Sequence, residues 1–197
     1  MTKRFPVKAM LCSKLAIATA LVVGATPAAA QSLQGTFAPP TGASVNQSVP
    51  GLTTVTVTAP QAVIDWTATG PSSGGLTTFQ AINTTANFQG TANFAILNRV
   101  ATTVSTDGIY LNGNINSTVN GLTGGTVYFY SPNGIVVGQN AIINVGSLGL
   151  TTSPIANDGS GNWMTGFGGA SPSVTFGAAA TNSYVRTDTG SLIKSNG

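Results

Sequence analysis

The sequence predicts an all-β protein wound as a parallel β-helix, a solenoid of stacked short strands. Charged residues make up only 6% of the chain, and 42% of its residues are hydrophobic. No window after residue 30 repeats apolar residues at helical spacing with charged residues between them. Instead, apolar runs of four or five residues alternate with pairs such as Asn120-Gly121 and Asn133-Gly134, which accept positive φ cheaply. Strands this short suit a coil that turns a corner every few residues.

The expected strands follow the β-branched and aromatic residues. Residues 52–59 alternate almost perfectly, with Val55 and Val57 on one face and threonines on the other. Further strand signals are found at residues 62–66, 79–82, 87–90, 94–100, 108–121, 126–130, 134–137, 141–150 and 174–194. Residues 157–169 interrupt the pattern as a glycine-rich excursion, and we expect Trp163 and Phe167 to cover apolar surface there.

A weak repeat supports the solenoid. Ile115 and Ile135 are twenty positions apart, and Val127 and Val145 are eighteen apart, near the length of about 20 residues expected for one coil. Asparagines recur at the expected corners, where stacked amides can form a ladder. They are Asn114, Asn116, Asn133 and Asn144. A β-sandwich with degenerate hairpins remains open as the alternative.

Residues 1–30 have the pattern of a cleavable secretory signal. A basic start is followed by the apolar residues 15–25, a run too short to be a permanent membrane anchor. Small residues at Ala28 and Ala30 then indicate cleavage before Gln31. The rest of the chain contains no cysteine, so it is expected to fold without disulfides.

The charge that remains after this signal excludes nucleic acid as a partner. Four of the seven basic residues lie in the signal, and the remainder keeps three against four aspartates, a formal charge of −1. Three scattered cations cannot form a phosphate-binding face. The high isoelectric point of the whole chain therefore does not indicate a nucleic-acid-binding function.

The residue inventory predicts no enzyme, cofactor or metal site. The chain has no histidine and no glutamate, so the commonest bases and metal ligands are missing. No two aspartates lie within four residues of each other, which leaves open only a distant pair meeting in the fold beside a cation. The aspartates are Asp65, Asp107, Asp158 and Asp188.

Three stretches in order carry a specific resemblance. They are "FQGTANFAILNRV" at 88–100, "GIYLNGNI" at 108–115 and "VYFYSPNGIVVGQNAIINVGSL" at 127–148. Together they resemble the N-terminal secretion domain of filamentous-haemagglutinin-type exoproteins, which are exported by two-partner secretion. The similarity runs from about residue 62 to 154, and the stretch before it fits the family's N-terminal cap more loosely.

This resemblance implies a right-handed parallel β-helix, with cap strands in residues 31–61 and the β-helical domain in residues 62–197, truncated at its C-terminus. It implies export to the periplasm of a Gram-negative cell and recognition there by an outer-membrane β-barrel transporter. The domain would then nucleate β-helix folding at the cell surface or in the extracellular space. Any ligand on a host or neighbouring cell would be bound by a region further downstream.

The family's Asn-Pro-Asn-Gly turn corresponds to Ser131, Pro132, Asn133 and Gly134. The serine replaces the first asparagine, and its hydroxyl is expected to cap the turn. With Asn98 and Arg99, these residues are the expected transporter-recognition or turn residues, and both roles remain open. Arg99 is the only basic residue between Lys14 and Arg186, so it either pairs with an aspartate or contacts a partner.

An alternative function is a free-standing adhesin or carbohydrate-binding β-helix. Exposed aromatic side chains on one face would favour this alternative. The candidates are Tyr110, Tyr128, Tyr130 and Trp163.

Overall fold

The computed structural model describes residues 31–157 and 162–196, and these form strands and turns without a helix. Within them no helix is long and apolar enough to cross a membrane. The predicted signal of residues 1–30, with Ala28 and Ala30, lies outside the described residues, as does Asp158. Gln31 is the first described residue and is exposed.

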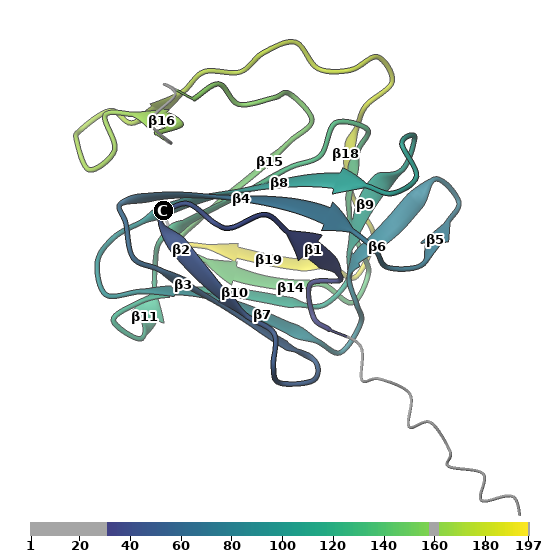
Figure 1. The fold of residues 1–197 in the computed structure, drawn as a ribbon, viewed down its shortest axis with the longest axis horizontal. Helices are drawn as coiled ribbons and strands as arrows, with labels where there is room; N and C mark the ends of the chain where they lie inside the picture. Colours follow the sequence, from purple (N-terminus) through teal and green to yellow (C-terminus); the bar gives the residue numbers. More distant parts are fainter. Residues whose placement is uncertain (1–30, 158–161, 197) are drawn as a thin grey trace, which may run out of the picture.

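The strands form three main sheets and one small hairpin (Figure 1). Sheet 1 contains, in spatial order, β1 (Gly35–Phe37), β4 (Gln61–Ala68), β8 (Ala95–Thr102), β12 (Thr126–Tyr130) and β15 (Ser147–Thr151). Sheet 2 contains β2 (Ala43–Asn46), β3 (Leu52–Val57), β7 (Thr85–Gly90), β10 (Asn114–Val119), β14 (Ile142–Val145) and β19 (Leu192–Ser195), with β11 (Leu122–Thr123) beside β10. Sheet 3 contains β5 (Ser72–Ser73), β6 (Leu76–Gln80), β9 (Gly108–Leu111), β13 (Ile135–Val137) and β18 (Val185–Thr187). The hairpin pairs β16 (Met164–Thr165) with β17 (Ser173–Val174).

The chain visits the sheets repeatedly in one order: sheet 2, sheet 1, sheet 3. We call each such passage a round; the first is β3, β4 and β6, and the second is β7, β8 and β9. Strands of successive rounds pair in parallel in all three sheets. Among the named strands, antiparallel pairing involves β1, β2, β5, β11 and the β16–β17 hairpin, and the described residues also form three isolated antiparallel bridges. The prediction of an all-β, mostly parallel protein is therefore confirmed, and the alternative of an antiparallel sandwich is wrong.

The predicted repeat of about twenty residues is wrong for the residue pairs on which it was based, although β12 and β15 are paired at a spacing of 21. Hydrogen-bonded partners on neighbouring strands lie 34 positions apart for Asp65 and Arg99 and 29 apart for Asn87 and Asn116. Ile115 pairs with Ile143 in sheet 2, whereas Ile135 belongs to sheet 3. A spacing of twenty joins residues of different sheets, because one round holds three strands together with corners of unequal length.

The core consists of side chains stacked in register. Ala86, Ile115 and Ile143 occupy equivalent positions on β7, β10 and β14 and are fully buried. In β3 the expected alternation is confirmed, since Val55 and Val57 point inward. Edge-to-face aromatic contacts connect the three sheets inside. This chain of rings runs from Phe37 through Trp66, Phe79 and Phe129 to Phe88.

Glycines occupy corners where successive rounds approach closely. The expected strand at 141–150 divides into β14 and β15 at Gly146, where a Cβ would lie 2.4 Å from the carbonyl oxygen of Gly125. The predicted positive φ is found at Asn120 and Gly121, which connect β10 to β11. The strand expected at 79–82 ends earlier, at Gln80, and the side chain of Ile82 is exposed.

Between β15 and β18 the chain leaves the rounds and lies over the outer face of sheet 1, as the green-to-yellow segment with β16 shows in Figure 1. Trp163 and Met164 are buried there in a cluster with Val63, Ala95 and Leu97. The prediction that this excursion covers apolar surface is confirmed for Trp163, and Phe167 packs against the same cluster.

Truncating the core column tests the stacking. We expect Ile115→Ala to lower the free energy of unfolding by about 2–5 kcal/mol, because it opens a cavity between Ala86 and Ile143. The control Leu122→Ala, at a residue that is 75% exposed, should change it by less than about 0.5 kcal/mol. Urea unfolding of both variants measures the two changes in the free energy of unfolding. Equal losses would contradict the stacking of Ala86, Ile115 and Ile143 in the core.

Candidate functional site: a groove on the outer face of sheet 1

Three polar side chains stand in one row across the open part of sheet 1. Asp65, Arg99 and Tyr130 are register partners on β4, β8 and β12 and point outward. The Arg99 guanidinium donates through Nε to Asp65 Oδ1 at 2.6 Å and through Nη2 to Oδ2 at 2.8 Å. The expectation that Arg99 pairs with an aspartate is confirmed. Both side chains remain partly exposed, at 32% for Arg99 and 53% for Asp65.

This ion pair borders a groove of about 450 Å³. Arg99 from one predicted motif and Pro132 from the other both line it, although they are far apart in the sequence. Phe37, Trp66 and Tyr130 contribute to its lining as well. The Trp66 indole points into the core, so the groove offers Tyr130 and Pro132 next to a paired guanidinium and carboxylate, a mixture that suits binding of another protein chain.

Asn98 lies beneath this row, on the inner side of the same strand. Successive residues of a strand point to opposite faces, so Asn98 is fully buried while Arg99 points outward. Its Oδ1 accepts a hydrogen bond from Trp66 Nε1 at 3.1 Å, and its Nδ2 donates to the Tyr128 carbonyl at 3.1 Å. The side chain of Asn98 therefore ties β4, β8 and β12 together from within.

Ser131 does not cap the turn as expected. It is the next inward position after Phe129, so its side chain is buried. Its Oγ makes no hydrogen bond among the described residues, while its backbone N–H donates to the Thr151 carbonyl at 3.1 Å. The strand alternation of β12 continues through Ser131 and turns the hydroxyl away from the turn backbone.

Asn133 holds the turn instead. Its Nδ2 donates to the carbonyl oxygens of Ser105 at 2.7 Å and Asp107 at 3.1 Å. Gly134 has φ of 155°, and a Cβ there would lie 3.2 Å from the Tyr184 ring. The prediction that Gly134 adopts a conformation other residues resist is confirmed.

Asp107 is a structural residue that the sequence did not single out. It is buried, and its carboxylate accepts hydrogen bonds from the hydroxyls of Ser72 and Thr77, the latter at 3.0 Å. Because Asn133 donates to its carbonyl, Asp107 connects the β5–β6 hairpin to the turn at 131–134. Its hydroxyl partners are 30 and 35 positions away in the sequence, so no local pattern indicates this role.

The described aspartates lie in separate interactions. Asp65 pairs with Arg99, Asp188 pairs with Arg186 at 3.2 Å, and the Asp107 carboxylate accepts hydrogen bonds from hydroxyl groups. No group of three potential metal ligands occurs in residues 31–157 and 162–196.

The aromatic residues proposed for an adhesive face do not form one. The adhesin alternative requires Trp163 to be exposed, but it is buried against Tyr128, with ring centroids 5.1 Å apart, and its Nε1 donates to the Ala62 carbonyl at 3.0 Å. Tyr110 lies in another sheet, where its hydroxyl donates to Asp188. Only Tyr130 borders the groove beside Arg99.

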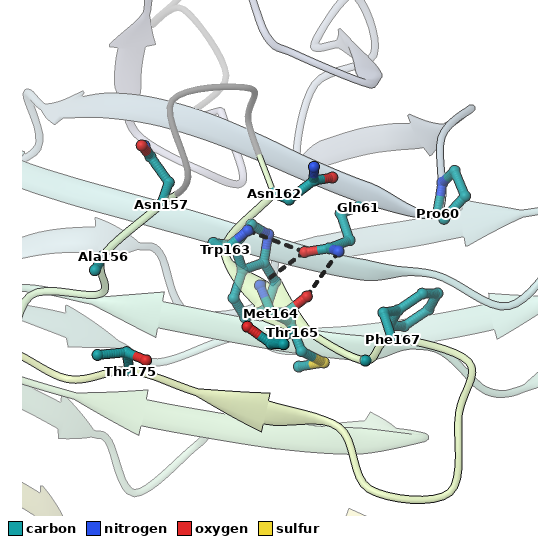
Figure 2. Close-up of a pocket in the computed structure, with 11 residues that line it drawn as sticks. Pro60, Gln61, Ala156, Asn157, Asn162, Trp163, Met164, Thr165, Phe167 and Thr175 are labelled. Carbon is teal, nitrogen blue, oxygen red and sulfur yellow. Dashed lines mark hydrogen bonds between the residues drawn. The ribbon is translucent and has the colours of Figure 1, made fainter.

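A second pocket, of about 610 Å³, marks the boundary between sheet 1 and the excursion. Figure 2 shows the Gln61 side chain at its centre. Gln61 Oε1 accepts from the backbone N–H groups of Trp163 at 3.0 Å and Met164 at 2.8 Å, and its Nε2 donates to the Met164 carbonyl at 2.9 Å (Figure 2). One glutamine thus replaces a strand partner and fixes the excursion to β4.

Comparison with known proteins assigns no family. No family model matches the chain, and no curated protein matches it. The motif order and the groove geometry are therefore the basis on which a function can be proposed.

Neighbouring residues of β8 should differ sharply in their contribution to stability. Asn98→Ala leaves the Trp66 indole N–H and the Tyr128 carbonyl buried without their partner, which should cost about 2–4 kcal/mol of unfolding free energy. Arg99→Gln breaks a partly exposed ion pair and should cost less than about 1 kcal/mol. Chemical denaturation measures the loss of unfolding free energy in each variant. A larger loss for Arg99→Gln than for Asn98→Ala would refute the inward orientation of Asn98 and the outward orientation of Arg99.

Burial raises the pKa of Tyr110 above its ordinary value, and the Asp188 carboxylate raises it further. The folded state therefore holds the phenol proton more tightly than the unfolded state. The resulting contribution of Tyr110 to the stability of the folded state is fully present below pH of about 10. It is lost as the pH rises through the raised pKa of Tyr110. Tyr110→Phe should flatten the alkaline loss of stability, measured by urea unfolding between pH of about 9 and 11. An unchanged slope would contradict this assignment.

Proposed function

We propose that the chain is a secretion-targeting domain of the two-partner type, folded as a right-handed parallel β-helix behind a cleavable signal in residues 1–30. The recurring order of sheet 2, sheet 1 and sheet 3, with parallel pairing between rounds, supports the solenoid. The right-handed winding and the N-terminal cap in residues 31–61 are proposed from the resemblance to the two-partner secretion domains. The observation that carries the function is that Arg99 and Pro132, from the two recognition motifs, line one groove.

The structure supports a division of labour within the predicted recognition residues. Arg99 and Pro132 line the groove and can contact a partner. Asn98 and Ser131 are buried, and Asn133 binds the loop before β9, so these residues shape the groove from behind. The proposed partner is an outer-membrane β-barrel transporter that meets the domain in the periplasm.

The open end of the sheets supports a nucleating role. β15, β18 and β19 are the edge strands at one end of sheets 1, 3 and 2. Ile193 continues the column of Ile115 and Ile143 and is 39% exposed there. An edge with unpaired backbone groups accepts a further strand in register, so folding would propagate from this domain at the cell surface.

A secretion assay tests the proposal. The double variant Arg99→Gln/Pro132→Ala should reduce release into the medium at least about fivefold, in a Gram-negative host that carries the barrel transporter encoded nearest to this gene, because two groove contacts of modest strength are lost. Leu122→Ala, at an exposed residue of β11 outside the groove, should be released normally. Circular dichroism of the purified variants controls for folding.

Two outcomes would contradict the proposal. Undiminished release of the double variant would remove the groove as the recognition site. Equal release of the unmodified chain with and without the transporter would remove the secretion role itself.

A further inference from the structure

The outer face of sheet 2 carries mostly uncharged amides and hydroxyls on β2, β3, β7, β10 and β14. Strand alternation points the core residues of these strands inward. The outward positions are polar except Leu52 on β3 and Ile142 on β14, and Lys194 on the edge strand β19 follows Asn144 in register. Two rows cross the strands in register. The first row is Asn46, Thr54, Asn87, Asn116 and Asn144, and the second is Ser44, Thr56, Gln89 and Thr118. The sequences of β2, β3, β7, β10 and β14 contain no charged residue.

Hydrogen bonds between neighbouring strands orient these side chains. Asn116 Nδ2 donates to Asn87 Oδ1 at 3.1 Å, and Gln89 Nε2 donates to Thr56 Oγ1 at 3.3 Å. Of the asparagines predicted to form a ladder, Asn116 hydrogen-bonds a stacked asparagine, and it does so in mid-strand between β7 and β10. A primary amide has two donor hydrogens and two acceptor lone pairs, so each amide keeps hydrogen-bonding capacity that faces solvent.

The same face is hollowed. One depression of about 430 Å³ and another of about 260 Å³ both include Gln89 and Thr118 in their linings, so they adjoin. Together they form a trough that reaches from Thr56 on β3 across β7 and β10 to Asn144 on β14. The turn at Asn120-Gly121 borders it at the end of β10.

We propose that this trough binds a neutral polysaccharide. An uncharged lining gives no electrostatic attraction to phosphate, sulfate or carboxylate groups, so it matches a ligand without charge. Amides that both donate and accept match the adjacent hydroxyls of a sugar ring. An apolar partner would bury these groups without hydrogen bonds, which is costly.

The periodicity of the trough fits a polymer. Equivalent side chains recur once per strand, at the strand spacing of about 4.8 Å, so a chain of repeating sugar units can make the same contact on successive strands. The excursion covers part of sheet 1, and sheet 3 carries the Arg186–Asp188 ion pair. The charged residue of sheet 2, Lys194, lies on the edge strand β19 and is not in the lining of either depression. This binding site is separate from the groove on sheet 1 and does not depend on the secretion role.

Affinity electrophoresis of the purified protein tests the inference. Gels contain dextran, mannan or hydroxyethyl cellulose as neutral probes, and heparin or polygalacturonate as charged controls. The protein should be retarded by at least one neutral polymer and by neither charged polymer. Retardation by no neutral polymer, or equal retardation by the charged ones, would overturn the proposal.

Variants locate the site. Gln89→Ala/Thr118→Ala should weaken binding about fivefold or more, since each lost hydrogen bond reduces affinity severalfold, without lowering the melting temperature. Gln139→Ala, an exposed glutamine outside the trough, is the matched control and should bind normally. Equal weakening in the control, or full binding by the double variant, would contradict the assignment. A dimer in sedimentation that the double variant dissociates would instead assign this face to self-association.

Discussion

In-register backbone hydrogen bonding between parallel strands of successive rounds holds the rest of this structure in place. The described residues contain few charges and no cysteine, so ion pairs and disulfides cannot organise the fold. Register decides which side chains stack inside, as Ala86, Ile115 and Ile143 do. It also decides which polar residues line up outside. A shift of one residue would exchange the two faces of a strand.

The same alternation explains the groove on sheet 1. Asn98 and Arg99 are adjacent in sequence but have opposite roles, since one bridges three strands from within and the other pairs with Asp65 outside. Ser131 has no such bridge, and its buried hydroxyl is left without a hydrogen bond. Such a group costs folding free energy. Hydrogen bonds in the second half of the turn offset this cost. Asn133 donates to the carbonyls of Ser105 and Asp107, and the Asp107 carboxylate accepts from Thr77.

The sequence predicted strands where the pattern is local, but the alternation expected over residues 174–194 is mostly irregular, with β18 and β19 as its later strands. Residues 126–130 were expected as a strand and form β12 with those bounds. The repeat length could not be predicted from apolar spacing, because Ile115 and Ile135 look equivalent in composition but lie in different sheets. The burial of Trp163 depends on Gln61 and Ala62, about a hundred positions earlier. Long-range contacts of this kind leave no periodic trace in one sequence.

The register between rounds can be tested directly by disulfide cross-linking. Asn87 and Asn116 are partners on β7 and β10, so Asn87→Cys/Asn116→Cys should form an intramolecular disulfide under mild oxidation. Asn87→Cys/Asn144→Cys should not, because β10 lies between β7 and β14. Both variants carry Cys12→Ser, which leaves only the paired cysteines. Mass spectrometry of the peptides gives the result, and a disulfide in the second pair with none in the first would contradict the strand order on which this account depends.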